Sequence, residues 1–461
     1  MSFLGLLDIS YPSSSTLLAL SLALTLPACV VPKVLGPNEV GTESDTGEGS
    51  TSEGSTSEGE TGESSTSEGE TGAPPVCEAG GGEAGVLAWA LSGDELPAFS
   101  RAVAVDPSER LVLAGSVVVE NGDLDLRVDV RGDDGIEAWL HGYGGAFGLD
   151  DLALDVAVDG AGNVHALYRE TILSLEEDMY ETSDARLVVL RYDPAGEQIW
   201  RWEQEHADVE IGNTYAPEGA LAIVDGAPRV LVRAPGEPTL VIALDDLGEE
   251  VSTATLAAPA GLSVERAAIA SDGRVFVAGD LEGEMASHEL WLGGFADDGA
   301  LLWSDQFGGL DDSPTALIPD PEAGVLLAWS TSLPGGVDNH LRRYDGNGAA
   351  LWSAAVPLSG LDSGIAAGAI ACDGVVLLTG ASDRDPAPES AWGFRRELWV
   401  AAYGLDGVEL WSTFHAFGDV ESYGEGIDVA ALANGDAIVV GNALAGDGAT
   451  SLPWLGRFGG G

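Results

Sequence analysis

Paired aspartates recur in the loops of this chain, and their type and spacing are the first to suggest a chemistry. Asp150-Asp151 and Asp311-Asp312 each follow a glycine-rich stretch, in AFGLDD and FGGLDD. Oxygen-rich loops of this kind suit Ca²⁺, which takes about six to eight oxygen ligands. Recurrence in register favours the other interpretation, in which each aspartate caps its own turn through the backbone. Ca²⁺ stays open, and no other cofactor is expected.

A second candidate is segment 381–397, which combines arginines with aromatic residues. Arginine beside exposed aromatics is typical of the residues that dominate protein interfaces. The segment also interrupts the repeat described below, and binding residues are often found in such variable loops. We therefore predict a ligand-binding loop, with a loop of no function as the alternative. Its candidate residues are Arg384, Trp392, Phe394, Arg395 and Arg396.

Evidence for catalysis is weak in this sequence. The six histidines are scattered without the spacing of metal ligands. The sequence contains neither a Gly-x-Ser-x-Gly nucleophile turn nor a phosphate-binding loop. Carboxylates are too abundant for one pair to be singled out as an acid and a base. We therefore expect a protein that is not an enzyme.

The charge balance narrows the choice of partners. The 461 residues include 19 basic and 76 acidic side chains, which gives a net charge of −57. A field of this sign repels nucleic acid and anionic membrane surfaces, and it favours cations and basic partners. No nucleic-acid partner is expected, and a membrane is expected to be reached only through a lipid anchor.

The N-terminal region predicts export. Residues 16–29, TLLALSLALTLPAC, form an apolar run of secretory-signal length that is short for a membrane span. The sequence Leu26-Pro27-Ala28-Cys29 resembles the lipobox of bacterial lipoproteins, which implies lipid attachment at Cys29. Residues 1–29 are thus a predicted signal peptide. The expected location is the outer membrane or the cell surface, with a secreted or periplasmic protein as the alternative.

Residues 30–77 are predicted to be a disordered linker. The sequence STSEGETG occurs twice, at 55–62 and 65–72, and the region is rich in Ser, Thr, Gly and Glu. Such a composition offers almost no apolar surface to bury, so it does not form a core. The linker would lift the folded domain off a membrane.

An internal repeat organises the rest of the chain. A glycine followed four residues later by tryptophan closes each unit, and between these motifs lie short apolar runs separated by Asp/Gly turns. Four strands in a unit of this length indicate a propeller blade. The motifs are GVLAW (85–89), GIEAW (135–139), GEQIW (196–200), GALLW (299–303), GAALW (348–352) and GVELW (407–411), with a weakened GEEVS at 248–252.

Residues 83–461 resemble the bacterial seven-bladed β-propeller repeats, and the Asp-x-x-Gly-x-x-x-Trp part is similar to quinoprotein blades. The quinoprotein resemblance implies a cofactor pocket that is often covered by adjacent cysteines. This sequence has no Cys-Cys pair and departs from that pattern.

Counting the units predicts how the ring closes. The last unit, 412–461, lacks a fourth strand, which the isolated strand at 83–90 can supply without leaving an exposed sheet edge. The prediction is an all-β, seven-bladed propeller over 78–461, closed by an N-terminal strand that completes the C-terminal blade. Cys77 just before this strand and Cys372 in a turn of the sixth unit would then share a face, as a candidate disulfide.

The expected function is non-catalytic binding at the cell envelope. A monomeric propeller would bind a protein, glycan or cationic ligand through the face that carries the long loops. The alternative is a propeller enzyme with an axial acidic site, either a quinoprotein-like oxidoreductase or a lyase or hydrolase. A deep axial pocket with converging charged groups would favour the enzyme.

Overall fold

The computed structural model describes most of the chain from Glu83 onward. Cys29, Cys77, Asp311, Trp392 and Phe394 lie outside the described residues, as do the predicted signal peptide and the predicted linker. The described ranges are 83–93, 95–119, 122–145, 150–175, 181–209, 218–233, 237–282, 288–309, 312–334, 336–358, 360, 363–384, 395–417, 423–444 and 451–461.

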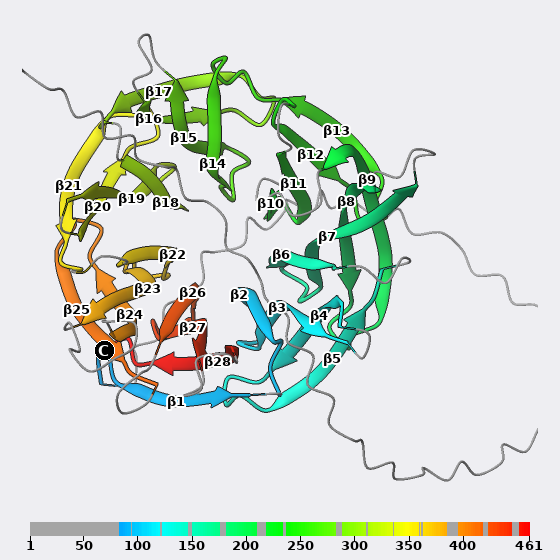
Figure 1. Ribbon diagram of the computed structural model, residues 1–461, viewed down its shortest axis with the longest axis horizontal. Coiled ribbons are helices and arrows are strands. Elements are labelled where there is room, and N and C mark those ends of the chain that lie inside the picture. Colours follow the sequence, from blue (N-terminus) through cyan, green and yellow to red (C-terminus); the bar gives the residue numbers. More distant parts are fainter. Residues whose placement is uncertain are drawn as a thin grey trace, which may run out of the picture. The chain divides into compact units, whose positions relative to one another are not determined.

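These residues form seven four-stranded antiparallel sheets arranged as the blades of a propeller (Figure 1). The predicted fold class is thus confirmed. Among the described residues, no helix has the length and apolar character needed to cross a membrane.

Each blade runs from an innermost strand near the axis to an outermost strand at the rim. Blade 1 consists of β2 (Phe99–Val105), β3 (Leu111–Val118), β4 (Leu124–Arg131) and β5 (Glu137–Tyr143). Blade 2 consists of β6 (Leu152–Val158), β7 (Val164–Leu175), β8 (Glu181–Tyr192) and β9 (Gln198–Val209). Blade 3 consists of β10 (Glu218–Val224), β11 (Ala227–Arg233), β12 (Leu240–Leu244) and β13 (Glu250–Thr255). Blade 4 consists of β14 (Leu262–Ile269), β15 (Val275–Glu282), β16 (His288–Phe295) and β17 (Leu301–Phe307). Blade 5 consists of β18 (Asp312–Pro319), β19 (Val325–Leu333), β20 (Gly336–Tyr344) and β21 (Ala350–Val356). Blade 6 consists of β22 (Gly364–Ile370), β23 (Val376–Arg384), β24 (Arg395–Tyr403) and β25 (Glu409–His415). Blade 7 consists of β26 (Gly424–Ala431), β27 (Ala437–Leu444), β28 (Ser451–Phe458) and β1 (Leu87–Ser92).

The ring closes in blade 7 as the sequence predicts. β1 pairs antiparallel with β28, from Leu87 opposite Phe458 to Ser92 opposite Trp454. The backbone N–H of Gly85 donates to the carbonyl of Gly459 at 2.8 Å, and the N–H of Gly459 donates to Val86 at 3.0 Å. Two hydrogen bonds with the same pattern close the turn between the third and fourth strands of blade 2. The C-terminal glycines and Gly85 thus form an equivalent turn from two distant parts of the chain.

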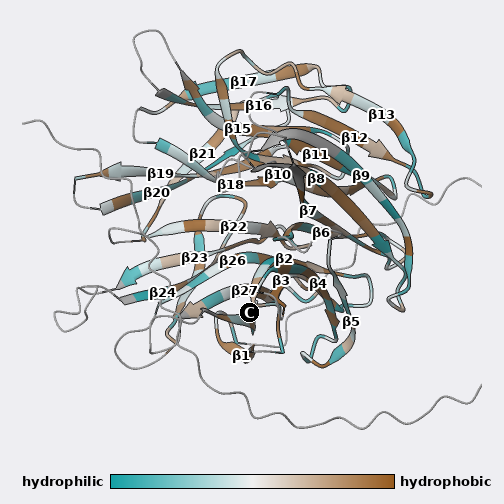
Figure 2. Cartoon of the chain, turned by 45° about the vertical axis from the view of Figure 1, so that its right-hand side comes forward, coloured by the Kyte–Doolittle hydropathy of each residue, from teal (hydrophilic) through white to brown (hydrophobic). Residues whose placement is uncertain are grey.

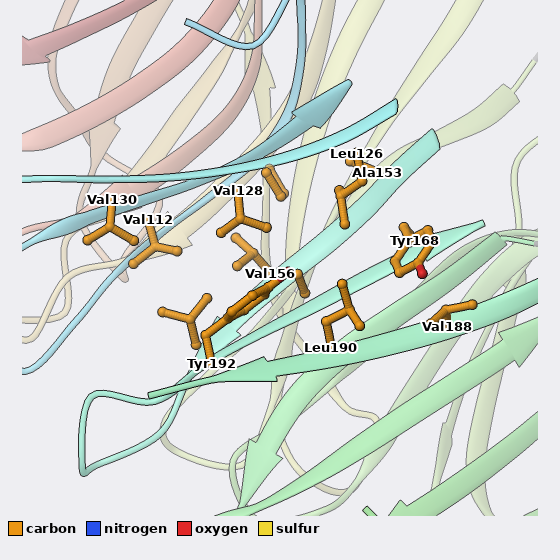
Figure 3. Packing of buried hydrophobic residues seen from close by; sticks show 14 residues of the cluster. Val112, Leu126, Val128, Val130, Ala153, Val156, Tyr168, Val188, Leu190 and Tyr192 are labelled. Atoms are coloured by element: carbon orange, nitrogen blue, oxygen red, sulfur yellow. The ribbon is translucent and has the colours of Figure 1, made fainter. Parts of the chain in front are cut away.

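The hydrophobic core lies between the blades rather than inside one of them. Each of the seven clusters of buried residues combines side chains from two neighbouring blades. Figure 3 shows the cluster between blades 1 and 2, where Val128 and Val130 of β4 pack near Val156 of β6. The middle strands are buried on both faces, whereas outermost strands such as β1 alternate between half-buried and exposed residues. Figure 2 shows the resulting hydrophobic and hydrophilic positions along the strands.

The Gly-x-x-x-Trp motif joins neighbouring blades. The indole N–H of Trp139 in blade 1 donates to the carbonyl of Pro194, in a turn of blade 2, at 3.3 Å. In the same turn Gly196 has a φ of 93°, and a Cβ there would lie only 2.8 Å from the Trp139 ring. A glycine is needed both for this backbone conformation and for this contact. Trp139 therefore has a structural role, and the acceptor of its indole N–H belongs to the next blade.

Candidate functional site

The innermost strands surround the axis of the propeller (Figure 1). Six of them, all except β10, contain a register shift that leaves one residue without a partner on the neighbouring strand. Such bulges bend a strand and re-aim a side chain. Four of the six bulged residues line a pocket on the axis, namely Arg101, Glu265, Ala366 and Ile427.

The pocket has a volume of about 470 Å³ and is lined by residues from blades 1, 3, 4, 6 and 7. Its lining lies toward the starts of the innermost strands and the ends of the second strands, on the face where β23 ends at Arg384 and β24 begins at Arg395. Small residues such as Gly219, Ala220 and Gly364 leave the space open. The charged side chains of the lining are four arginines and two glutamates: Arg101, Arg233, Arg266, Arg396, Glu265 and Glu425.

Backbone and side-chain contacts hold Arg266 and Glu265 in place at the pocket. Arg266 donates from Nε to the carbonyl of Thr315 and from Nη1 to the carbonyl of Glu265, both at 2.8 Å. The Glu265 carboxylate accepts a hydrogen bond from Ser313 at 2.8 Å. These contacts tie blade 4 to blade 5 beside the pocket.

On blade 6, Arg396 lies between an aromatic ring and a carboxylate. Its Nη1 donates to the hydroxyl of Tyr423 at 2.6 Å, and its Nη2 lies 3.1 Å from Glu425 Oε2. Its guanidinium carbon lies 4.8 Å from the centroid of the Tyr423 ring. The ring and the ion pair together fix the orientation of this arginine.

Arg101 is exposed at the pocket, and the partly buried carboxyl of Asp428 lies near it. Asp428 accepts hydrogen bonds from the backbone N–H groups of Val103 and Val429, at 2.8 and 2.9 Å. Removal from water, and next the charge of Asp155, raise the pKa of Asp428 to about 7, although Arg101 and the backbone donors oppose the shift. Desolvation likewise raises the pKa of Asp155 to about 6. The axis therefore carries two carboxyl groups that titrate near neutral pH.

These raised pKa values predict a pH-dependent stability. In the unfolded chain a carboxyl group titrates near 3.8, so the folded state holds extra protons between that pH and about 7. Stability from this group is complete below pH 3.8 and is lost as the pH rises through about 7. We expect the midpoint of thermal unfolding to fall between pH 5 and pH 8, and to fall less in Asp428→Asn than in the wild type.

The control for this pH series is Asp345→Asn, which removes the same charge. Turn hydrogen bonds from the backbone N–H groups of Ala349 and Asn347 lower the pKa of Asp345, so it stays ionised across this pH range. The raised pKa of Asp428 would not explain the pH dependence of the unfolding temperature if both variants weakened that dependence equally. The same holds if Asp428→Asn left the dependence unchanged.

The paired aspartates accept backbone hydrogen bonds. Asp150 accepts from Leu124 at 3.0 Å, and Asp151 accepts from Gly145 at 2.6 Å. Asp312 accepts from Gly309 at 2.8 Å. In the described ranges, no group of three or more His, Cys, Asp or Glu side chains is placed to hold a metal ion. A Ca²⁺ site stays a prediction.

Segment 381–397 differs from the predicted loop at both of its ends. Arg384 is the last residue of β23 and pairs with Arg395, the first residue of β24, so the ladder extends into the segment. The repeat pattern did not predict this extension. The extension depends on backbone pairing between β23 and β24, and the repeat motif does not include the paired residues. Arg396 lines the axial pocket, whereas the sequence suggested it only as part of a surface loop.

Cys372 is disulfide-bonded in the structure. The chain has two other cysteines, Cys29 and Cys77, and both lie outside the described residues. The pairing of Cys372 with Cys77 therefore stays a prediction.

Sequence reasoning missed three arginines of the pocket. Arg101, Arg233 and Arg266 lie on separate strands and belong to no shared motif. The one available signal was their scarcity, since only 19 of 461 residues are basic. An arginine on an innermost strand of a propeller is a candidate for lining an axial site.

No family model matches the chain, and no curated protein matches it by sequence. Among solved structures, the chain is similar to a puromycin hydrolase at 13% identity and a TM-score of 0.40, over 77% of this chain and 53% of that one. The chain thus spans about half the length of that hydrolase. A protein of unknown function from Dyadobacter fermentans is 12% identical with a TM-score of 0.42, over 81% and 99% of the two chains.

NanB sialidase from Streptococcus pneumoniae is 9% identical with a TM-score of 0.43, over 81% of this chain and 70% of that one. Likenesses at these values carry no argument about function. The chain's own sheets establish its fold, a seven-bladed β-propeller.

Proposed function

We propose that this chain is an exported binding protein, anchored through a lipid on Cys29 and raised from the membrane by linker 30–77. The ligand would be bound without chemical change in the axial pocket. One observation carries the proposal: in the five-bladed pocket of about 470 Å³, whose converging charges would otherwise suit an enzyme, both carboxylates are engaged, Glu425 by Arg396 and Glu265 by Ser313. Pockets of roughly 300–1,000 Å³ with a few placed polar groups are typical of small-molecule sites.

The contacts of the pocket's carboxylates favour binding over acid–base catalysis. Glu425 is paired with Arg396, and Glu265 accepts a hydrogen bond from Ser313. A general base needs a carboxylate that is within reach of the substrate and ready to take its proton. These glutamates instead hold other parts of the pocket.

The second candidate is a hydrolase or lyase with an axial acidic pair. The observation that favours it is the pair Asp155 and Asp428, whose raised pKa values resemble those of catalytic groups. Both carboxyls, however, accept backbone hydrogen bonds from the neighbouring blade, Asp155 from Leu221 and Asp428 from Val103. These contacts supply a structural reason for the aspartates.

Filling the pocket tests the binding role. A Cβ added at Gly364 meets nothing within 4 Å, so Gly364→Leu should project into the pocket without disturbing the sheet. Gly142 on β5 is equally open and lies away from the pocket, so Gly142→Leu is the matched control. Thermal shifts would be measured with citrate, putrescine and maltose, and recovered ligand would be checked by NMR.

We expect at least one probe to stabilise the wild type and Gly142→Leu but not Gly364→Leu, and to be recovered unchanged. Stabilisation that persists in Gly364→Leu, or no stabilisation by any of the three probes, would reject the axial site. If the wild type converts a probe chemically and Asp428→Asn does not, the chain is an enzyme and the binding role is rejected.

A further inference from the structure

The axial pocket reverses the charge of the molecule around it. The whole chain carries a net charge of −57, whereas the pocket is lined by four arginines and two glutamates. We infer that the pocket binds a small organic polyanion, a molecule with at least two carboxylate or phosphate groups. This inference rests on the proposed binding role and adds the chemical class of the ligand.

The arginines come from different sides of the ring. Arg101 belongs to blade 1, Arg233 and Arg266 to blades 3 and 4, and Arg396 to blade 6. A ligand with a single anionic group would meet the arginines of one side only. A ligand with two or three such groups can contact arginines from opposite blades at once, which explains why the charge is spread around the axis.

The lining also makes the arginines ready to bind. Arg266 is held by the carbonyls of Thr315 and Glu265, and Arg396 is held by Tyr423 and Glu425. A guanidinium that is already oriented loses less side-chain entropy when a ligand arrives. Its positive charge, held in a fixed place, attracts a carboxylate or phosphate group.

Arg101 supplies charge that is not balanced by the pocket's own carboxylates. It is exposed, and the neighbouring acidic group, Asp428, is partly protonated at neutral pH because its pKa is about 7. Glu425, in contrast, lies beside Arg396. The part of the pocket near blade 1 is therefore the most favourable place for an anionic group.

The test is calorimetric titration of the full chain at constant ionic strength. The probes are citrate and fructose 1,6-bisphosphate as polyanions, acetate as a single carboxylate, and putrescine as a dication. The key variant is Arg101→Gln, and its control is Arg229→Gln. Arg229 lies on β11, four residues before Arg233, and is not among the residues that line the pocket, so the control removes the same charge from elsewhere.

We expect a polyanion to bind at least about ten-fold more tightly than acetate, and Arg101→Gln to weaken it about ten-fold or more, as for a charged hydrogen bond. Arg229→Gln should change the affinity by less than about two-fold, because solvent and salt screen a distant charge. Citrate and the bisphosphate separate the carboxylate from the phosphate source. Polyanions that bind no better than acetate, or equal losses in both variants, would overturn the inference. Putrescine binding that Gly364→Leu abolishes would overturn it while leaving the proposed binding role intact.

Discussion

Deletion of residues 85–92 should leave this chain unable to fold, with aggregation in place of a cooperative thermal transition. The deletion removes β1, the outermost strand of blade 7, which pairs with β28. The exposed edge of β28 would then offer unpaired backbone groups to other chains. Trp89 and Leu91 would also be lost from the hydrophobic cluster that joins blade 7 to blade 1. Soluble protein with a single sharp melting transition would contradict this expectation.

A permuted chain provides the matched control for this deletion. The turn at the seam is made by Gly459, Gly460 and Gly461 on one side and by Gly85 on the other. Residues 85–93 placed directly after Gly461 should rebuild β1 through an ordinary turn and restore the melting transition. If the permuted chain also fails to fold, the loss is not explained by the missing strand.

Deletion of residues 30–69, in contrast, should leave the melting temperature of the propeller unchanged.

Replacement of Arg131 by methionine should destabilise the propeller by about 3–5 kcal/mol, the usual cost of removing one partner from a buried ion pair. Arg131 and Asp129 on β4 are 3% and 0% exposed, and their closest approach is 2.8 Å. Arg131 also donates to the carbonyls of Glu95 at 2.6 Å and Gly135 at 3.1 Å. It therefore connects the pair to the segment that follows β1. Denaturant unfolding monitored by tryptophan fluorescence would measure the change.

Two further variants separate the buried pair from the loss of charge alone. Arg274→Met breaks an ion pair whose Asp272 partner is 46% exposed, so its effect should stay within about 1 kcal/mol. Asp129→Leu combined with Arg131→Met should recover part of the loss, because the fully buried Asp129 carboxylate is removed, and the recovery stays partial because Arg127, 3.2 Å from Asp129, loses its partner. If Arg131→Met costs no more than Arg274→Met, the seam does not depend on this pair.

The ring closure was predictable because its signals are local and repeated. Gly85-Val-Leu-Ala-Trp89 has the same spacing as the motif that ends five of the other six blades, and 412–461 lacks that motif. A repeat of this kind specifies the positions that pair and the turns that connect them. The structure adds the reason for the glycine, since Gly196 lies against the ring of Trp139.

The candidate site was much less predictable. The paired aspartates were chosen for oxygen-rich composition, and the described ones accept backbone hydrogen bonds in the structure. Arg396 was chosen for its neighbours in a predicted loop, whereas it lies in β24 and lines the axis. Composition predicted cationic or basic partners, and this stays a prediction. Net charge averages over the whole molecule, so it does not describe a single pocket lined by arginines.

By itself, the sequence determined the all-β class, the number of blades and the place where the ring closes. These properties depend on strand periodicity, turn residues and spacing, which act over a few residues and recur along the chain. Only the tertiary structure decided that Arg101, Arg233, Arg266 and Arg396 meet at one pocket. They are separated by up to 295 positions, and a closed ring brings its innermost strands together however far apart they lie in the sequence.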